Sequence, residues 1–302
     1  MAKSDLQISF ENFPANTQIR VGHWPSNNQT NEVFVILHGR TEFIEKYTET
    51  AAELLTRGYD VWSMDWRGQG LSAREIENRQ KGHIDSFDTY LKDLKWFLTH
   101  IIPQHDVKPL VLAHSMGANV VARTLLEQQN NFKGVVLTAP MFDIPMSGIN
   151  ASFAKVLAHI GQLTGFHKKW VPGMQHHASK AKTFKNNTLT SDKERFYQNQ
   201  NEIEKQPNLA IDRPTIGWLH AAFQSMNALY RLPPTADDCC PVLVCTALAD
   251  QVVSISAQAE ICAKHGWKQI PFHGSKHEIL QEADTIRDHF WRAFDNFQSQ
   301  LF

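Results

Sequence analysis

The chain contains 302 residues, a length that fits either two domains or one large α/β unit. Its 31 acidic and 30 basic side chains leave a net charge of −1, which excludes the strongly basic surface of a dedicated nucleic-acid-binding protein. Hydrophobic residues make up 42% of the chain and charged residues 20%, proportions that are typical of a globular protein with a large core and exclude extensive disorder.

The four cysteines, Cys239, Cys240, Cys245 and Cys262, lie late in the chain without Cys-x-x-Cys spacing. They indicate neither a zinc site nor a disulfide framework, and they are typical of a reducing compartment. The first residues are charged and polar where a secretory signal needs an apolar stretch, and no run approaches about 18 apolar residues. We therefore expect a cytoplasmic protein that holds no metal and no cofactor.

Short apolar, β-branched runs alternate with longer segments of helical period, which predicts parallel strands joined by helices. The expected strands are residues 33–37, 60–64, 109–113, 134–138, 242–246 and 269–272. Two earlier stretches, 6–13 and 17–24, predict an N-terminal hairpin at the edge of the sheet. The fold class is therefore α/β, with a mostly parallel sheet of about eight strands and helices on both faces.

Helices are indicated by apolar residues spaced three and four apart. One such stripe runs through Phe87, Leu91, Leu94, Leu98 and Ile101, and a closing one through Ile286, Phe290, Phe294, Phe297 and Leu301. Asp85 or Ser86 is expected to cap the first of these helices. Two more helical segments, from residue 44 and from about residue 256, are expected to end at Gly58 and Gly266.

The alternation stops between about residues 141 and 236, where several helical stretches occur without a convincing strand. We interpret 141–236 as a helical cap inserted into a core formed by 1–140 and 237–302. The last cap helix, roughly 215–232, is apolar on more than one face. Its apolar side chains form either the cap's own small core or part of a substrate pocket, and any contact with the inner face of a membrane is expected through the cap.

A candidate nucleophile follows the expected strand at 109–113, which runs into Ala113-His114-Ser115-Met116-Gly117 and then into a helical segment. A strand, a sharp turn and a helix around a serine are typical of a nucleophile elbow. The residues two before and two after the serine must be small so that strand and helix can approach each other, and Ala113 and Gly117 meet this requirement. We therefore predict that Ser115 is a catalytic nucleophile.

A serine hydroxyl needs a base, and the base is a histidine oriented by a carboxylate. His277 follows the last expected strand, where this architecture has its base, and His273 is its positional alternative. Asp250 lies just past the carboxyl end of the strand at 242–246, the edge at which active-site groups gather. The order serine, acid, histidine is the one that such folds use.

Other aspartates compete with Asp250 for the role of the acid. Asp143 follows the preceding strand and is the main alternative, whereas Asp237 and Asp238 come before a strand and are poorer candidates. The oxyanion of the tetrahedral intermediate needs two backbone N–H donors. We expect these from Met116, which follows the serine, and from Arg40, which follows Gly39 after an earlier strand. The Arg40 side chain itself is expected in solvent or paired with a carboxylate such as Glu42.

These blocks resemble the α/β-hydrolase superfamily, and within it the branch of monoacylglycerol lipases and bacterial lysophospholipases of the L2 type. The likeness rests on His38-Gly39-Arg40-Thr41-Glu42 with Lys46-Tyr47, on Asp65-Trp66-Arg67-Gly68-Gln69-Gly70-Leu71-Ser72, and on residues 274–280. It implies a Ser115, Asp250, His277 triad, an oxyanion hole from Arg40 and Met116, and a cap that shapes the acyl and leaving-group pockets. It also implies structural roles for Asp65 and Arg67.

The sequence departs from the family pattern at Ala113, at Thr41, where many relatives have a second glycine, and in the cap. The expected activity is hydrolysis of a carboxylic ester of a single-chain lipid, a lysophospholipid or a monoacylglycerol, through an acyl-serine intermediate. Other acyl substrates are alternatives: a short-chain ester, a thioester or an N-terminal peptide bond. A non-catalytic binding protein on the same fold is a further alternative. The basic runs 167–169 and 176–177 favour a phosphate or neutral headgroup, although a solvated basic face also explains them.

Overall fold

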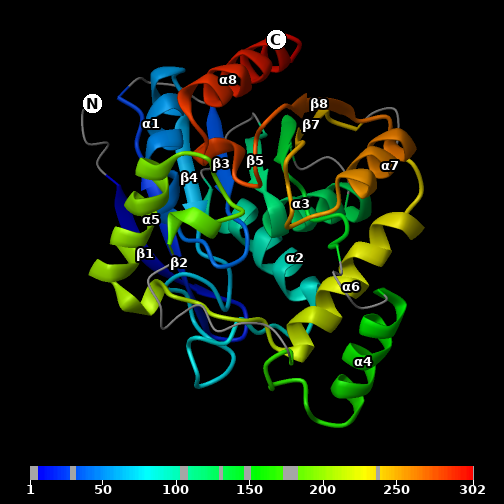
Figure 1. Cartoon of the computed structure of the whole chain (residues 1–302). Helices are drawn as coiled ribbons and strands as arrows, with labels where there is room; N and C mark the ends of the chain where they lie inside the picture. Colours follow the sequence, from blue (N-terminus) through cyan, green and yellow to red (C-terminus); the bar gives the residue numbers. More distant parts are fainter. Residues whose placement is uncertain are drawn as a thin grey trace.

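The structure is a computed structural model that describes residues 6–27, 32–102, 108–128, 132–145, 151–172, 183–235 and 239–301. Its centre is one eight-stranded sheet with the strand order β1-β2-β4-β3-β5-β6-β7-β8 (Figure 1). The strands are β1 (Gln7–Phe13), β2 (Thr17–Trp24), β3 (Val33–Leu37), β4 (Asp60–Met64), β5 (Leu110–His114), β6 (Gly134–Thr138), β7 (Val242–Ala247) and β8 (Lys268–Phe272). β2 is antiparallel to both its neighbours, and all other pairs are parallel.

The central strands are buried along their whole length. Every residue of β3, β5, β6 and β7 is buried, because helices cover both faces of a parallel sheet. This is why nearly continuous apolar runs marked these strands in the sequence. The predicted ranges match β3, β4 and β6, differ from β7 and β8 by one residue at one end, and lie one residue before β5. The predicted hairpin is also present as β1 and β2.

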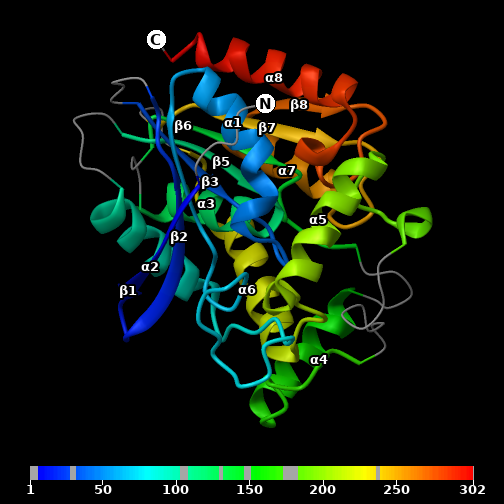
Figure 2. The same ribbon diagram turned by 90° about the vertical axis from the view of Figure 1, so that its left-hand side faces the viewer.

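Two layers of helices enclose the sheet. α1 (Thr48–Thr56) and α8 (Asp284–Gln298) lie together on one face, where the Arg57 guanidinium stacks 4.1 Å over the Trp291 ring and pairs with Asp295 (Figure 2). α2 (Phe87–Trp96), α3 (Ser115–Gln128) and α7 (Ile255–His265) cover the other face. The mostly parallel sheet with helices on both faces is therefore as the sequence predicted.

The helix ends follow local sequence signals. Ser86, rather than Asp85, caps α2, because its side chain accepts a hydrogen bond from the Asp88 N–H. Gly58 and Gly266 follow α1 and α7 with φ of 90° and 67°, the left-handed conformation that glycine adopts without strain. The segment expected to be helical from residue 44 begins as a 3₁₀ turn, Ile44–Tyr47, before α1.

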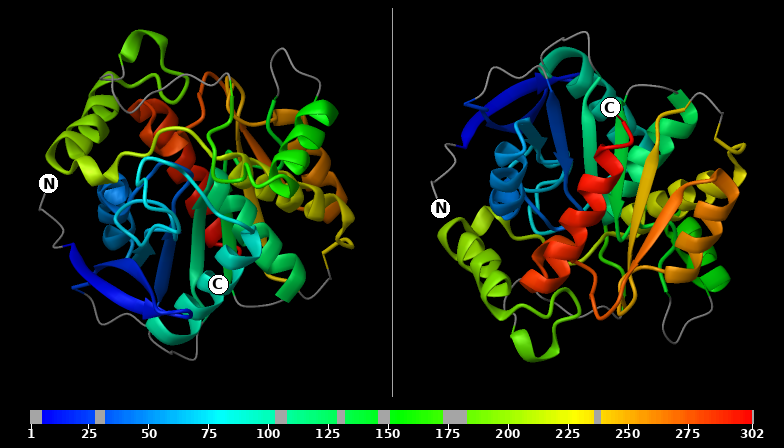
Figure 3. Two further views of the ribbon diagram at one scale, coloured as in Figure 1. Left: turned by 90° about the horizontal axis from the view of Figure 1, so that it is seen from below. Right: turned by 90° about the horizontal axis from the view of Figure 1, so that it is seen from above.

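Residues 141–236 contain helices and short 3₁₀ turns, and no strand in their described part. α4 (Ala151–Leu163) and α6 (Ile216–Arg231) pack against each other below the sheet, whereas α5 (Lys193–Lys205) lies beside α1, where Arg195 pairs with Glu49 (Figures 1 and 3). Seen from below, the segment between α5 and α6 crosses from one side of the molecule to the other (Figure 3).

The buried face of α6 belongs to the main core of the protein. Trp218, Phe223, Met226 and Leu229 are part of the same continuous cluster as the sheet, and the Trp218 ring lies 5.8 Å from that of Phe87 in α2. This face is therefore not a separate core of the 141–236 region. None of the helices in the described residues combines the length and apolar character needed to cross a membrane.

Candidate active site

The parallel register brings the ends of several strands level with one another. Leu37 of β3 is paired with Ala113 of β5, and His114 of β5 with Thr138 of β6. At the far side, Ala247 of β7 is paired with Phe272 of β8. The segments that follow these strands therefore emerge along one edge, and they carry Arg40, Ser115, Asp250 and His277.

Ser115 lies at the tip of a sharp turn between β5 and α3. Its φ is 51°, a left-handed value that strains a residue other than glycine and projects its side chain away from strand and helix. A Cβ at Gly117 would lie 2.6 Å from the His38 carbonyl oxygen, so no larger residue fits there. Ala113 is fully buried, and its methyl group is accommodated where the family has glycine.

A hydrogen-bonded chain joins Ser115, His277 and Asp250. The Ser115 Oγ lies 3.0 Å from His277 Nε2, and His277 Nδ1 lies 2.7 Å from Asp250 Oδ2. The Asp250 carboxylate is completely buried, and its Oδ1 accepts hydrogen bonds from the N–H groups of Val252 and Val253. Those two bonds fix the carboxylate so that its other oxygen faces the imidazole, which selects the tautomer with the proton on Nδ1.

The alternative residues lie elsewhere. Asp143 turns its carboxylate to the N–H of the next residue, Ile144, at 2.9 Å. His273 is exposed to solvent, whereas His277 is buried. The candidates Asp237 and Asp238 lie outside the described residues. The structure thus brings together the three residues favoured from the sequence.

The two expected oxyanion donors are backbone N–H groups beside Ser115. Met116 is in the first turn of α3, where N–H groups have no partner within the helix. No hydrogen bond between described residues uses the N–H of Met116 or of Arg40. Thr41, the residue after Arg40, has a φ of 61° and donates its N–H to Gln69 Oε1 at 2.9 Å. Glycine adopts this left-handed conformation without strain, whereas threonine does not.

The Arg40 side chain is neither solvated nor paired with Glu42, contrary to expectation. Its guanidinium stacks 5.1 Å from the centre of the Trp218 ring and donates a 3.0 Å hydrogen bond to the Asp212 carbonyl oxygen. Burial lowers the pKa of Arg40 to about 10. The side chain therefore ties the loop after β3 to the segment that leads into α6, a contact between residues 172 positions apart.

A buried network of charges that the sequence analysis did not foresee surrounds this loop. Lys46 Nζ lies 2.5 Å from Glu42 Oε1 and 2.6 Å from Glu278 Oε1, and each side chain is at most 8% exposed. Glu42 Oε2 also accepts the Gly39 N–H at 2.6 Å and the Tyr47 hydroxyl at 2.8 Å. Because Glu278 follows His277 in the chain, Lys46 connects the Arg40 loop with the His277 loop.

The pKa values of this network depend on burial and on the paired charges. Burial on its own raises the pKa of Glu42, but the Lys46 ammonium outweighs it and holds the pKa below its ordinary value. Burial likewise opposes the charge on Lys46, and the carboxylates of Glu278 and Glu42 overcome it and raise the pKa. Glu42 and Lys46 therefore form a charged pair at neutral pH.

His114, immediately before Ser115, is buried against His277, with ring centroids 4.7 Å apart. Its Nδ1 lies 3.1 Å from both the carbonyl oxygen and the hydroxyl of Thr138. Burial lowers the pKa of His114 to about 3, although the Glu42 carboxylate opposes this shift. His114 is therefore neutral at neutral pH and adds no positive charge beside His277.

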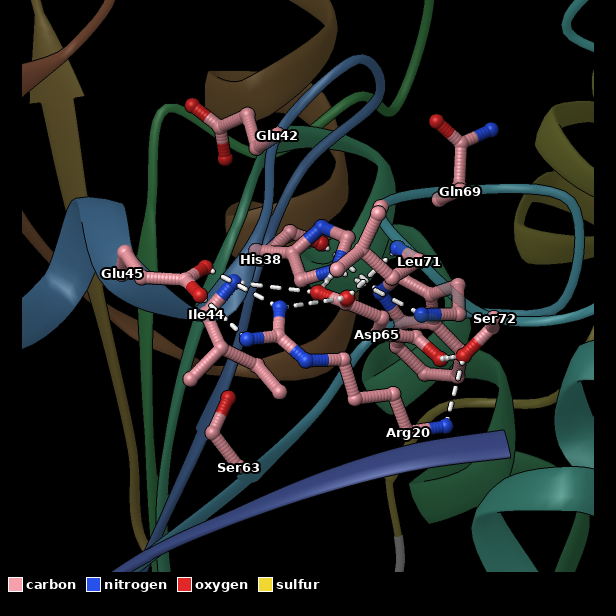
Figure 4. Close-up of polar contacts among 12 residues, drawn as sticks. Arg20, His38, Glu42, Ile44, Glu45, Ser63, Asp65, Gln69, Leu71 and Ser72 are labelled. Atoms are coloured by element: carbon pink, nitrogen blue, oxygen red, sulfur yellow. Dashed lines mark hydrogen bonds and ion pairs between the residues drawn. The ribbon is translucent and has the colours of Figure 1, made fainter. Parts of the chain in front are cut away.

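Asp65 anchors the loop after β3 from below (Figure 4). Its Oδ1 accepts the Ile44 N–H at 3.0 Å, and its Oδ2 accepts the Leu71 N–H at 2.8 Å and Arg20 Nη1 at 3.2 Å. His38 Nε2 lies 3.4 Å from Asp65 Oδ1. Burial raises the pKa of Asp65, but His38 and Arg20 together hold it below its ordinary value.

The glycines and arginine of the same motif have separate structural tasks. A Cβ on Gly70, whose φ is 47°, would lie 2.1 Å from the carboxyl carbon of Asp65, so this glycine allows the loop to fold over the carboxylate. Arg67 donates two hydrogen bonds to Asp93 of α2, at 2.9 and 2.8 Å. The residues with implied structural roles thus hold the loops beneath Ser115 without reaching it.

The comparison with known families identifies the class of protein. The family model described as "Serine aminopeptidase, S33" (Hydrolase_4) matches residues 28–284. The chain belongs to this family of serine hydrolases, and it is therefore an enzyme with an α/β-hydrolase fold. Among the described residues, the one group spaced for a metal ion is Glu75, His83 and Asp85 in the loop before α2.

The relatives agree with the resemblance found in the sequence. The chain is 29% identical to lysophospholipase L2 of Escherichia coli (strain K12), over 88% of this chain and 80% of that protein. It is 26% identical to a probable lysophospholipase L2 of Haemophilus influenzae, over 98% of this chain and 95% of that protein. The predicted membership of the branch that contains lysophospholipases and monoglyceride lipases is confirmed.

Solved structures confirm the fold. A soluble variant of the Saccharomyces cerevisiae monoglyceride lipase, in complex with a substrate analogue, superposes with a TM-score of 0.77 at 16% identity, over 100% of this chain and 98% of that one. A thermostable carboxyl esterase from Bacillus coagulans superposes with a TM-score of 0.76 at 17% identity, over 98% of each chain.

Proposed function

We propose that Ser115, His277 and Asp250 are the nucleophile, base and acid of this hydrolase, and that the N–H groups of Arg40 and Met116 form its oxyanion hole. The observation that carries the proposal is the unbroken hydrogen-bonded chain from Ser115 Oγ through the imidazole to the buried Asp250 carboxylate. Such a chain activates a hydroxyl that is otherwise a poor nucleophile.

The reaction proceeds in two halves. His277 Nε2 takes the proton of Ser115 as Oγ bonds to the acyl carbon, and the N–H groups of Arg40 and Met116 stabilise the oxyanion. When the bond to the leaving alcohol breaks, His277 returns the proton to the alcohol oxygen, which leaves an acyl-serine. Water then repeats the sequence, giving its proton to His277, releasing the fatty acid and restoring the Ser115 hydroxyl.

The proposed substrate is a carboxylic ester of a single-chain lipid, a lysophospholipid or a monoacylglycerol. Its support is the similarity to proteins named lysophospholipase L2 and to others named monoglyceride lipase. We further propose that 141–236 acts as the cap over the site, a role supported by the contact of Asp212 with the Arg40 side chain.

The outer face of α4 is suited to a lipid surface. Val156, Ile160, Leu163 and Phe166 follow one another at helical spacing, and each is between 48% and 73% exposed. Exposed lysines 168 and 169 follow directly, where anionic headgroups would lie. We propose peripheral contact with the inner face of the membrane through this face. The four free cysteines support a reducing, cytoplasmic location.

A fluorophosphonate probe tests the nucleophile. Wild-type protein is expected to be labelled on one serine and Ser115→Ala not at all, while the control Ser256→Ala, which changes an exposed serine on α7, is labelled as wild type. Ester hydrolysis by Ser115→Ala at the wild-type rate contradicts the assigned mechanism.

A substrate panel tests the acyl class. Lysophospholipids, monoacylglycerols, short-chain esters, an acyl thioester and aminoacyl amides are compared at equal concentration on wild type and Ser115→Ala. The expected kcat/KM is highest for one of the single-chain lipids. A preference for aminoacyl amides or thioesters contradicts the proposed substrate class but not the proposed triad. No turnover of any of them, with a tightly bound lipid extracted from the purified protein, indicates a binding protein instead.

Vesicle sedimentation tests the membrane contact. Leu163→Glu, which places a charge on the most exposed apolar residue of the face, is expected to reduce binding to vesicles with anionic lipid. Thr164→Glu, one residue along and off the apolar stripe, is the control. Equal sedimentation of wild type and Leu163→Glu excludes this face as the contact.

A further inference from the structure

Three side chains with metal-binding atoms converge in the loop between β4 and α2. One oxygen each from Glu75 and Asp85 and one ring nitrogen of His83 all lie within 4.8 Å of one another. The two carboxylates are exposed, while the imidazole is 2% exposed. The arrangement therefore has a fixed inner ligand and two outer ligands that are free to adjust.

His83 is oriented from behind as metal-bound histidines are. Its Nδ1 lies 2.7 Å from the hydroxyl of Thr215, a fully buried residue that caps α6 by accepting the Trp218 N–H. A hydrogen bond on one ring nitrogen fixes the ring and directs the other nitrogen toward the ion in most protein metal sites. The directed nitrogen here is Nε2, which faces the two carboxylates.

The buried Nε2 has no hydrogen bond to any described residue. Asp85 Oδ1 is 3.2 Å away, but it lies off the direction that an N–H···O hydrogen bond requires. A nitrogen buried without a partner is costly in either tautomer, because it leaves an N–H without an acceptor or a lone pair facing two carboxylates. A cation between the three groups removes both penalties.

Among the described residues, no lysine or arginine is paired with Glu75 or Asp85 more closely than 4.0 Å. That distance separates Glu75 from the Arg67 guanidinium, which donates hydrogen bonds to Asp93 and to Thr17 instead. The 3.2 Å between His83 Nε2 and Asp85 Oδ1 is close to the ~3.4 Å that separates two ligands of a tetrahedral zinc ion bound at about 2.0–2.1 Å. The Glu75 side chain, which is 24% exposed, would have to rotate inward to complete the site.

We propose that Glu75, His83 and Asp85 bind a divalent transition-metal ion of the zinc class, with water in the remaining coordination positions. One imidazole nitrogen with two carboxylate oxygens suits zinc better than calcium or magnesium, which prefer oxygen ligands alone.

The loop that would hold the ion is already hydrogen-bonded to the segment before α6 through its backbone. The Gly82 N–H donates to the Arg213 carbonyl oxygen, and the Thr215 N–H donates to the Gly82 carbonyl oxygen. The ion would cross-link Glu75 to His83 and Asp85 within the loop before α2, and the hydrogen bond between His83 and Thr215 connects it to the start of α6. Its binding should therefore raise the melting temperature without taking part in ester hydrolysis.

Calorimetric titration of zinc into tag-free, chelator-treated protein tests the site. Wild type is expected to bind one zinc ion with equal affinity whether or not Ser115 has been labelled with a fluorophosphonate. Glu75→Gln and Asp85→Asn, both at exposed side chains, are each expected to weaken this binding at least about tenfold. The control Glu77→Gln removes the same charge from an exposed position two residues from Glu75 and is expected to bind as wild type.

Melting curves with and without zinc give the second measurement. Zinc should raise the melting temperature of wild type and Glu77→Gln, and the rise should be lost in Glu75→Gln and Asp85→Asn. Four results overturn the proposal: no zinc binding by wild type, unchanged binding in either cluster variant, an equal loss in Glu77→Gln, or zinc binding without a rise in wild type. Zinc binding at any of the fourteen other histidines would be unchanged in the cluster variants and so gives the second of these results.

Discussion

Replacing Lys46 by methionine removes the one cation shared by Glu42 and Glu278 while keeping the length of the side chain. All three side chains are at most 8% exposed, so solvent cannot take over the role of the ammonium. Removing one partner from a buried ion pair costs about 3–5 kcal/mol of unfolding free energy. Protonating one stranded carboxyl instead costs about 4 kcal/mol at pH 7.5, three pH units above its ordinary pKa.

Urea unfolding followed by circular dichroism measures this loss. Lys46→Met is expected to unfold with about 3–5 kcal/mol less free energy than wild type at pH 7.5. The deficit should shrink as the pH falls toward 4.5, because the stranded carboxyl is then protonated at less cost in the folded variant. In the folded variant the pKa of the stranded carboxyl is raised above its value in the unfolded chain. The variant therefore loses stability as the pH rises.

Lys92→Met is the control, because Lys92 is exposed on α2 and its replacement should change the unfolding free energy by no more than about 0.5 kcal/mol. A Lys46→Met protein that unfolds within about 1 kcal/mol of wild type, or whose deficit is independent of pH, refutes the view that the buried network is charged and holds the two loops together.

Three further predictions follow from the site and its supports. Asp250→Asn keeps the shape of the acid but favours the wrong imidazole tautomer, so kcat for ester hydrolysis should fall about 10⁴-fold with the fold intact by circular dichroism; a fall of less than tenfold would point to another acid. Gly70→Ala should lower the free energy of unfolding in urea by several kcal/mol, because its Cβ would overlap the Asp65 carboxylate. Gly58→Ala, at φ 90° with open space around it, should lower it by only about 1 kcal/mol. Equal losses in the two variants would show that backbone strain alone matters. His114 has a folded-state pKa of about 3, below its ordinary value, so the unfolded chain takes up its proton first and stability is lost as the pH falls below about 6.5, by up to about 1.4 kcal/mol per pH unit. His114→Gln should unfold with a shallower dependence over this range, and an unchanged slope would exclude His114 as the cause.

Much of the fold could be predicted because burial leaves a local trace in the sequence. A strand covered on both faces favours an apolar residue at every position, and β3 shows this over its whole length. The turn at Ser115 was also recognisable, since its close contact with the backbone of His38 admits only glycine at position 117. The nearness of Asp250 and His277 follows from the level ends of β7 and β8.

The rest depends on contacts between distant parts of the chain, which leave no local pattern. Nothing near Arg40 indicates that its guanidinium lies over Trp218 rather than in solvent. Lys46 and Glu278 likewise meet only because the loops after β3 and β8 converge at one edge of the sheet. A charged residue in a polar loop is ordinarily exposed, so burial of this kind becomes visible only when the tertiary structure is known.

The segment before α6 is hydrogen-bonded to the loop before α2 at three successive points. The Asp212 N–H donates to Gln80, the Gly82 N–H to Arg213, and the Thr215 N–H to Gly82. Swinging α6 outward as a lid would break all three bonds at once, at about 0.5–1.5 kcal/mol each, and would also pull Arg40 away from its stacking partner. We therefore expect α6 to remain a fixed wall while a substrate enters, with any hinge located elsewhere in 141–236.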